Sequence, residues 1–216
     1  MMKKITKKLK RILLLIILLL LYITISAFSY ANAVCLEIAD SVFRLHVIAN
    51  SDSENDQNLK YIVRDEILKY INSISSDTKS KNEVIKLAKK NINYIQELAQ
   101  ETVYKQGFNY DVNVTIGNFA FPTKTYGDIT FPPGYYDALK IEIGEASGQN
   151  WWCVMFPPLC FVDVSSGIVP EESKELMKDN LSEEEYSLIS ENTDGVQFKF
   201  KLVEVLQNLS ISGIFM

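Results

Sequence analysis

The sequence predicts an α+β domain: a mainly antiparallel β-sheet with two long helices packed on one face, followed by an acidic, partly helical C-terminal tail. Three observations lead to this class. A short run of β-forming residues, 42–49, precedes two stretches whose apolar residues recur at helical spacing. After Gly107 the apolar spacing changes to two residues, and glycines separate the apolar runs. A segment rich in acidic residues follows the last of these runs.

Residues 1–33 have the pattern of an export signal. Six basic residues precede residue 12, an uncharged apolar run follows, and Ala31-Asn32-Ala33 fits a small-x-small cleavage site. The alternative is a retained membrane helix, because the stretch from Ile12 to Leu36 carries no charge and is about long enough to span a bilayer. In both interpretations the rest of the chain is exported, either free or tethered to the membrane through Ile12–Leu36.

The exported part is strongly acidic. Six of the 22 basic residues precede residue 12, so 16 remain against 27 acidic residues, a net charge of −11. This balance gives no bulk attraction for nucleic acid, so we expect no nucleic-acid partner. The remaining length is sufficient for one domain with a hydrophobic core. We expect residues 34–165 to form this exported domain and the acidic segment 166–216 to pack on it.

The first elements of the exported domain follow from the spacing of its apolar residues. Residues 42–49 are predicted to form a buried strand. The apolar stripe from Leu59 to Ile74 predicts a first helix. A second stripe predicts one continuous helix over residues 82–106, and Ser80 with Glu83 has the pattern of a capping box at its start.

Strands and short helices are expected in the second half of the chain. The strands are predicted at residues 112–116, 119–126, 138–144, 151–156 and 160–164. The polar residues 144–150 have the composition of a hairpin turn. Residues 171–180 and 182–190 are predicted to form acidic helices, and residues 196–209 fit either a strand or an amphipathic helix.

The single histidine, His46, lies inside the first predicted strand. A catalytic interpretation would pair it with Asp52, Ser51 or a cysteine. We favour a simpler interpretation, in which His46 is hydrogen-bonded to a nearby backbone group or carboxylate. One histidine and three cysteines without metal-ligand spacing predict no metal site, and no cofactor-binding motif is found.

The polar residues 50–56 follow this strand and contain acidic residues at alternate positions. This spacing resembles the start of a calcium-binding loop, but Gln57 stands where that loop requires glycine. We favour helix capping by Ser51 or Ser53, because acidic and hydroxyl side chains satisfy free amides at a helix N-terminus.

A proline-rich turn interrupts the aromatic stretch 150–163. Pro157 and Pro158 should make this turn stiff, because each proline fixes φ and removes an amide donor. Cys153 and Cys160 lie on either side of the turn. Outside the cytoplasm they could form a disulfide, and the alternative is a pair of reduced, buried cysteines.

The two tryptophans of the chain, Trp151 and Trp152, are adjacent in this stretch. Alternation along a strand points them to opposite faces of the sheet. If one of them is exposed, it would make a good anchor for a protein partner. The alternative is that both are half-buried structural residues.

Three blocks of the sequence resemble the stage II sporulation protein R family. They are RLHVIANSDS at residues 44–53, FPTKTYG at residues 121–127 with a second Phe-Pro pair at residues 131–132, and NWWCVMFPPLC at residues 150–160. The resemblance covers about residues 43–163. It implies a protein that the forespore of an endospore-forming bacterium exports into the space between two membranes. There such proteins trigger a membrane-embedded aspartic protease of the mother cell, which then removes the pro-sequence of the sigma-E factor.

We therefore expect an exported signalling protein that carries no catalytic residues of its own. The residues that we expect to contact the protease are His46, Asn50, Asp52, Trp151, Trp152, Pro157 and Pro158. Two alternatives remain from the sequence. One is a secreted hydrolase that uses His46 with Asp52 or Cys153, and the other is a structural protein of the spore envelope anchored by the uncut Ile12–Leu36 helix.

Overall fold

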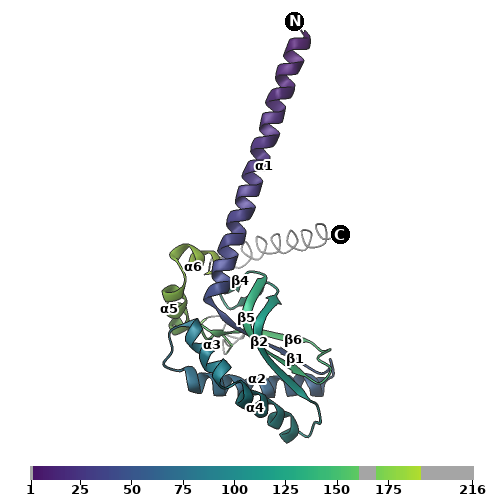
Figure 1. Cartoon of the computed structure of the whole chain (residues 1–216), viewed down its shortest axis with the longest axis vertical. Helices are drawn as coiled ribbons and strands as arrows, with labels where there is room; N and C mark the ends of the chain where they lie inside the picture. Colours follow the sequence, from purple (N-terminus) through teal and green to yellow (C-terminus); the bar gives the residue numbers. More distant parts are fainter. Residues whose placement is uncertain (1, 161–168, 191–216) are drawn as a thin grey trace.

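The computed structural model describes residues 2–160 and 169–190 (Figure 1). Four of its strands form one sheet in the order β2-β5-β1-β6, and β3 and β4 pair in a separate two-stranded sheet. The strands are β1 (Phe43–Ile48), β2 (Val112–Phe121), β3 (Lys124–Tyr126), β4 (Ile129–Phe131), β5 (Gly134–Ile143) and β6 (Asn150–Phe156). The class is therefore α+β, as the sequence predicted.

The four-stranded sheet is mixed rather than mainly antiparallel. The β2–β5 and β1–β6 pairs are antiparallel, but the central β1–β5 pair is parallel. The predicted hairpin at residues 144–150 is therefore wrong, because β1 lies between β5 and β6. The segment between these two strands instead crosses the end of β1.

Three helices cover one face of the sheet: α2 (Glu54–Ser75), α3 (Lys81–Lys90) and α4 (Ile92–Lys105). Their apolar stripes pack with β1, β2, β5 and β6 in the larger hydrophobic cluster. The predicted continuous helix 82–106 is two helices, because Asn91 leaves helical geometry and its side-chain amide donates to Leu87 O at 2.8 Å. The expected cap at the start of α3 is also absent, since the Ser80 side chain makes no capping hydrogen bond.

The other face of the sheet is also covered, which corrects the expectation that helices pack on one face only. It is covered by the end of α1 (Met2–Ser41), the β3–β4 pair, α5 (Glu171–Asn180) and α6 (Glu183–Ser190) (Figure 1). The apolar residues on this face form a second hydrophobic cluster, in which the acidic helices α5 and α6 bury Met177 and Ile189. The segment expected at residues 196–209 and, apart from Cys160, the strand expected at 160–164 lie outside the described residues.

Helix α1 is a single long helix that stands out from the rest of the molecule (Figure 1). Its part from Lys7 to Ser41 is long and apolar enough to cross a membrane, which fits a signal sequence or a membrane anchor. The apolar residues of the first half are exposed, whereas Val34, Ile38 and Ala39 are buried in the second cluster. The end of the apolar helix is therefore part of the folded domain.

Candidate functional site

His46 lies on β1 in a cluster of aromatic side chains. Its ring stacks on Trp152 at a centroid distance of 3.6 Å and meets Phe121 edge-on at 5.9 Å. Its Nε2 donates to Asn150 Oδ1 at 2.7 Å. The hydrogen-bond partner is thus a side-chain amide, where the sequence led us to expect a backbone group or carboxylate.

Burial keeps the His46 imidazole neutral. The side chain is only 6% exposed, and this desolvation is the main reason that its pKa is lowered to about 4. The cations of Lys140 and Arg44 act in the same direction, while the hydrogen bond to Asn150 acts against them. At pH 7 the ring is therefore uncharged, and its Nδ1 atom has no hydrogen-bond partner among the described residues.

The structure does not bring together the residues of the hydrolase hypothesis. Asp52 is exposed, and its Oδ1 accepts from Gln149 N at 2.7 Å. Cys153 packs in the cluster on the opposite face of the sheet from Trp152 and is joined to Cys160 by a disulfide. In the described part of the chain, neither residue is a hydrogen-bond partner of His46.

Asp56 fastens the loop that follows β1. It is buried, and Asn50 Nδ2 and Ser51 Oγ donate to its Oδ2 at 2.9 Å and 2.5 Å. Burial alone would raise the pKa of Asp56, but these hydrogen bonds, with others from Tyr110 and Ser53, outweigh it and hold the pKa below its usual value. The carboxylate is thus ionised and already surrounded by protein donors.

The start of α2 confirms the capping prediction. Ser53 is the N-cap, and its Oγ accepts from Asp56 N at 3.2 Å. Ser51 also contributes, because its hydroxyl accepts from Ser53 N while donating to Asp56. No group of three or more histidine, cysteine or acidic residues suited to a metal ion occurs among the described residues.

The same loop holds the crossover between β5 and β6. Asn50 Oδ1 accepts from Glu145 N at 3.0 Å, and Ala49 O accepts from Gly148 N at 3.0 Å. A Cβ atom on Gly148 would lie 2.2 Å from the backbone oxygen of Ser51, so only glycine fits this approach. Asn50, predicted as a partner contact, is therefore half-buried and engaged within the domain.

Lys60 completes the network from α2. Its ammonium group donates to Gln57 Oε1 at 2.5 Å and to Gln149 O at 3.0 Å. The side chain is only 1% exposed, and this burial, with the nearby Arg64 cation, lowers its pKa. Residues 50–60 and 144–150 thus form one hydrogen-bonded polar unit, which we call the loop clasp.

Trp151 and Trp152 point to opposite faces, as alternation predicted, but neither is fully exposed. Trp152 packs in the second cluster, and Trp151 packs beside α2 against the larger one. The Arg64 guanidinium lies 4.2 Å from the Trp151 ring centroid, and Tyr61 meets that ring edge-on at 5.5 Å. The alternative of two half-buried tryptophans is therefore the one that the structure contains.

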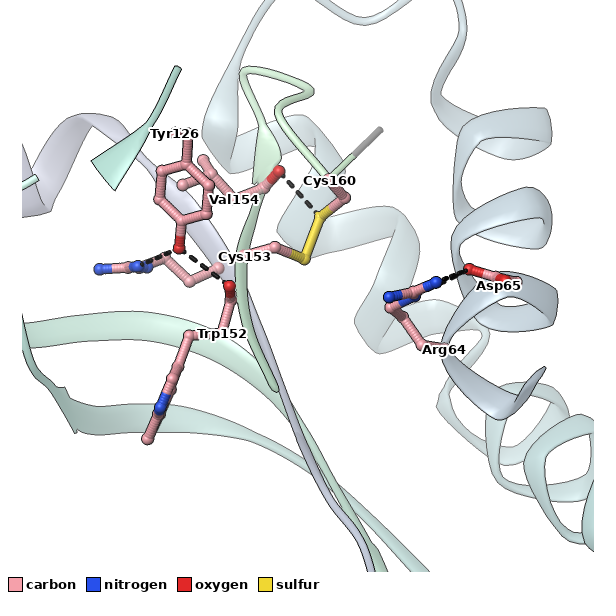
Figure 2. Close-up of a disulfide and its surroundings, with 8 residues drawn as sticks. Arg64, Asp65, Tyr126, Trp152, Cys153, Val154 and Cys160 are labelled. Carbon is pink, nitrogen blue, oxygen red and sulfur yellow. Dashed lines mark hydrogen bonds and ion pairs between the residues drawn. A yellow bond between two sulfur atoms is a disulfide. The ribbon is translucent and has the colours of Figure 1, made fainter. Parts of the chain in front are cut away.

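The Tyr61–Arg64–Trp151 group lies at the start of β6, where α2 passes that strand. Arg64 also forms an ion pair with Asp65 at 2.7 Å (Figure 2). Tyrosine, arginine and tryptophan are the residue types that most often dominate protein interfaces. The sequence analysis missed Tyr61 and Arg64, although their spacing of three on a helix placed both on one side of it.

The two prolines lie at the far end of β6. In the pairing with β1, Trp152 faces His46 and Phe156 faces Phe43. Pro157 lies five positions after Trp152, roughly 16 Å along a strand. The predicted contact surface is therefore two separate regions.

The proline turn is itself packed into the domain. Pro157 is buried and follows a cis peptide bond, and Pro158 is half-buried and accepts from Ser173 Oγ of α5 at 2.7 Å. Figure 2 shows the Cys153–Cys160 disulfide, whose Cα atoms lie 5.2 Å apart, beside this turn. Pro157 is thus inaccessible to a partner in this structure.

A buried cation that the sequence analysis missed links the strands. Arg44 is fully buried, and its guanidinium lies 4.2 Å and 4.7 Å from the ring centroids of Phe121 and Tyr136. It donates to Tyr126 Oη at 2.8 Å. Tyr126 in turn donates to Trp152 O at 2.9 Å, as Figure 2 shows. A charged residue in an apolar strand and the aromatic residues of block 121–127 were the available signals.

Comparison with known proteins agrees with the extent of this unit. A family model described as stage II sporulation protein R matches residues 39–166. A curated relative named "Stage II sporulation protein R", from Bacillus subtilis (strain 168), is 38% identical over 185 residues, which is 80% of this chain and 83% of the relative. No solved structure matches the chain. The family match spans all six strands, the loop clasp and the Arg44 contacts.

Proposed function

The chain belongs to the stage II sporulation protein R family, and from this premise we propose that it is an exported signal that activates a membrane-embedded aspartic protease by direct contact. The protease, once activated, processes the pro-form of the mother-cell sigma-E factor. In this proposal the chain makes and breaks no bond itself. The forespore exports it into the intermembrane space, where it is either free or anchored to the outer face of the membrane by α1.

The observation that supports a signalling role best is that residues of the three family blocks contact one another inside the domain. Arg44, Tyr126 and Trp152, one residue from each block, form a single hydrogen-bonded chain through the domain. His46 is neutral and stacked, and Cys153 is in a disulfide. Side chains used in this way stabilise a rigid shape, which is what recognition by a receptor requires.

Activation by contact needs a difference in affinity. A ligand shifts an equilibrium between inactive and active states only to the extent that it binds one state more tightly. The Tyr61–Arg64–Trp151 group is suited to such binding, because its large side chains are held in place and are only half-buried. The exposed Asp52 lies on the loop clasp at the same end of β6.

The test is co-expression of the full-length chain with the protease and the sigma-E precursor in a host that does not sporulate. We expect precursor cleavage only when all three proteins are present. Tyr61→Ala should lower cleavage by about tenfold or more, because truncation of a central interface residue costs about 1.4 kcal/mol or more. Tyr104→Ala removes an equally large, exposed side chain from α4 and should have no effect.

Two outcomes would count against this proposal. Cleavage of the precursor without the chain would show that no activator is needed. Cleavage lost in a His46→Phe variant that is folded and still binds the protease would indicate that the imidazole takes part in chemistry.

A further inference from the structure

β2 is an edge strand of the four-stranded sheet, and α4 closes only part of that edge. Two glutamines one turn apart on α4 bond to the strand as a neighbouring strand would. Gln96 Oε1 accepts from Val114 N at 2.8 Å, and its amide group donates to Val112 O. Gln100 Oε1 accepts from Val112 N at 2.8 Å, and its amide group donates to Tyr110 O at 2.8 Å.

The remaining part of the β2 edge has no such cover. β2 pairs with β5 from Val112 to Phe121 without a register shift, so every second residue directs its N–H away from the sheet. Val112 and Val114 belong to this outward set, and the set continues with Ile116, Asn118 and Ala120. The backbone amides of these last three residues have no acceptor in the described part of the chain.

This open half-edge lacks the usual protection against strand pairing. Edge strands are commonly blocked by lysine, proline or a bulge. Residues 115–121 contain neither lysine nor proline, and their pairing with β5 is regular. Asn118 and Ala120 are exposed, so an extended polypeptide can reach the free amides.

An acidic cleft of about 430 Å³ borders the same half-edge. Its lining includes Asn118 of β2, Asp137 of β5, and Glu37 and Asp40 of α1. Lys81 is the one cation that lines it, and this lysine is already paired with Asp137 at 2.7 Å and with Asp40 at 3.4 Å. Three carboxylates against one ammonium leave a net negative charge, which a basic side chain would reduce.

We propose that the outer edge of β2, from Ile116 to Ala120, binds an extended segment of a partner protein as an added strand, and that the acidic cleft receives a lysine or arginine of that segment. This inference rests on the proposed function, because the partner is the protease. It adds a second contact surface, at the sheet edge opposite β6 and the Tyr61–Arg64–Trp151 group. A second copy of the chain is a poorer occupant. Two β2 edges in contact would bring two negatively charged clefts together.

Hydrogen exchange of the backbone amides tests this proposal directly. The probe is the outward-facing part of the protease, added to the full-length chain in lipid nanodiscs. Binding should slow exchange at Ile116, Asn118 and Ala120 by at least tenfold, because each amide gains an acceptor. Val112 and Val114, which already donate to glutamine, are internal controls and should change little.

A pair of substitutions separates backbone recognition from side-chain recognition. Asn118→Pro removes an outward N–H that no acceptor uses in the described sheet, and proline is tolerated at such edge positions. It should weaken binding at least tenfold, whereas Asn118→Ala, which keeps the N–H, should stay within about threefold. If Asn118→Pro fails to fold, Glu37→Lys reverses an exposed charge of the cleft and should also weaken binding.

The outcomes are distinct. Binding with unchanged exchange at the three edge amides, or full binding by folded Asn118→Pro, overturns the edge assignment and leaves the proposed function intact. Protection of these amides that depends on chain concentration without the protease shows a second copy in place and also overturns it. No binding of the protease by the wild-type chain defeats the proposed function, and the edge assignment with it.

Discussion

The stability of the domain should decrease as the pH is lowered from about 7 to 5, because of its single histidine. The pKa of His46 is lowered from 6.5 to about 4, chiefly by burial. Between these values the unfolded chain binds a proton that the folded chain excludes, so acid favours unfolding. This contribution is fully present above the unfolded pKa and is lost as the pH falls towards 4.

The size of the effect follows from the two pKa values. Lowering the pH from 8 to 5 should reduce the free energy of unfolding by about 2 kcal/mol. For a domain of this length that corresponds to a decrease in Tm of roughly 4–8 °C. Asp56 does not interfere, because its pKa is held below its usual value and its contribution is lost only at lower pH.

Tryptophan fluorescence during thermal unfolding is the appropriate assay, since both tryptophans lie on β6. The full-length chain is measured in detergent micelles at several pH values. His46→Phe keeps an aromatic ring against Trp152 but cannot take up a proton, so its Tm should vary much less over this range. The reasoning is refuted if wild-type Tm is constant from pH 8 to pH 5, or if the variant shows the same slope.

Three further perturbations test the internal contacts. Reduction of the Cys153–Cys160 disulfide should cost about 2–3 kcal/mol by the chain-entropy relation for a short loop, measured by urea titration; a Cys153→Ala/Cys160→Ala variant should then be insensitive to reductant. Asp56→Asn should cost about 2 kcal/mol or more because it weakens buried charge-assisted hydrogen bonds, whereas the exposed Glu54→Gln should change stability by less than about 0.5 kcal/mol. Gly148→Ala should lower Tm measurably because its Cβ would meet backbone, and an unchanged Tm would contradict the close approach.

The local elements could be predicted because the spacing of apolar residues determines them. The strand expected at residues 42–49 is β1, Phe43–Ile48, and the stripe from Leu59 to Ile74 lies on α2. The break at Asn91 was missed because the apolar stripe continues through it. The end of α3 is marked by the non-helical backbone of Asn91 and by the hydrogen bond from its side chain to Leu87 O, which competes with the helical backbone bonds.

The pairing of strands could not be predicted from the same pattern. Residues 144–150 have a turn composition that fits a hairpin as well as it fits a crossover. What decides between them is contact with a distant segment: Asn50 and Asp52 accept hydrogen bonds from the backbone of Glu145 and Gln149. Such long-range bonds leave no periodic signal in the sequence.

In the candidate site too, the sequence predicted local features but not the long-range contacts. The position of His46 in a buried strand was evident, but its partner Asn150 lies 104 residues away. Arg44 was missed because its aromatic neighbours Phe121 and Tyr136 come from other parts of the chain. Block composition therefore identified the family, while only the fold shows that these blocks contact one another.

The measurement that tests the central claim most directly is the stoichiometry of activation. Increasing amounts of the full-length chain are added to a fixed amount of the protease and its substrate in membranes, and the rate of precursor cleavage is recorded. An activator that works by contact should raise the rate in proportion to the complex formed, reach a plateau at a fixed molar ratio, and lose its effect on removal. Full, lasting activation of the protease by a small fraction of an equivalent would contradict the account, because it would show turnover by the chain itself.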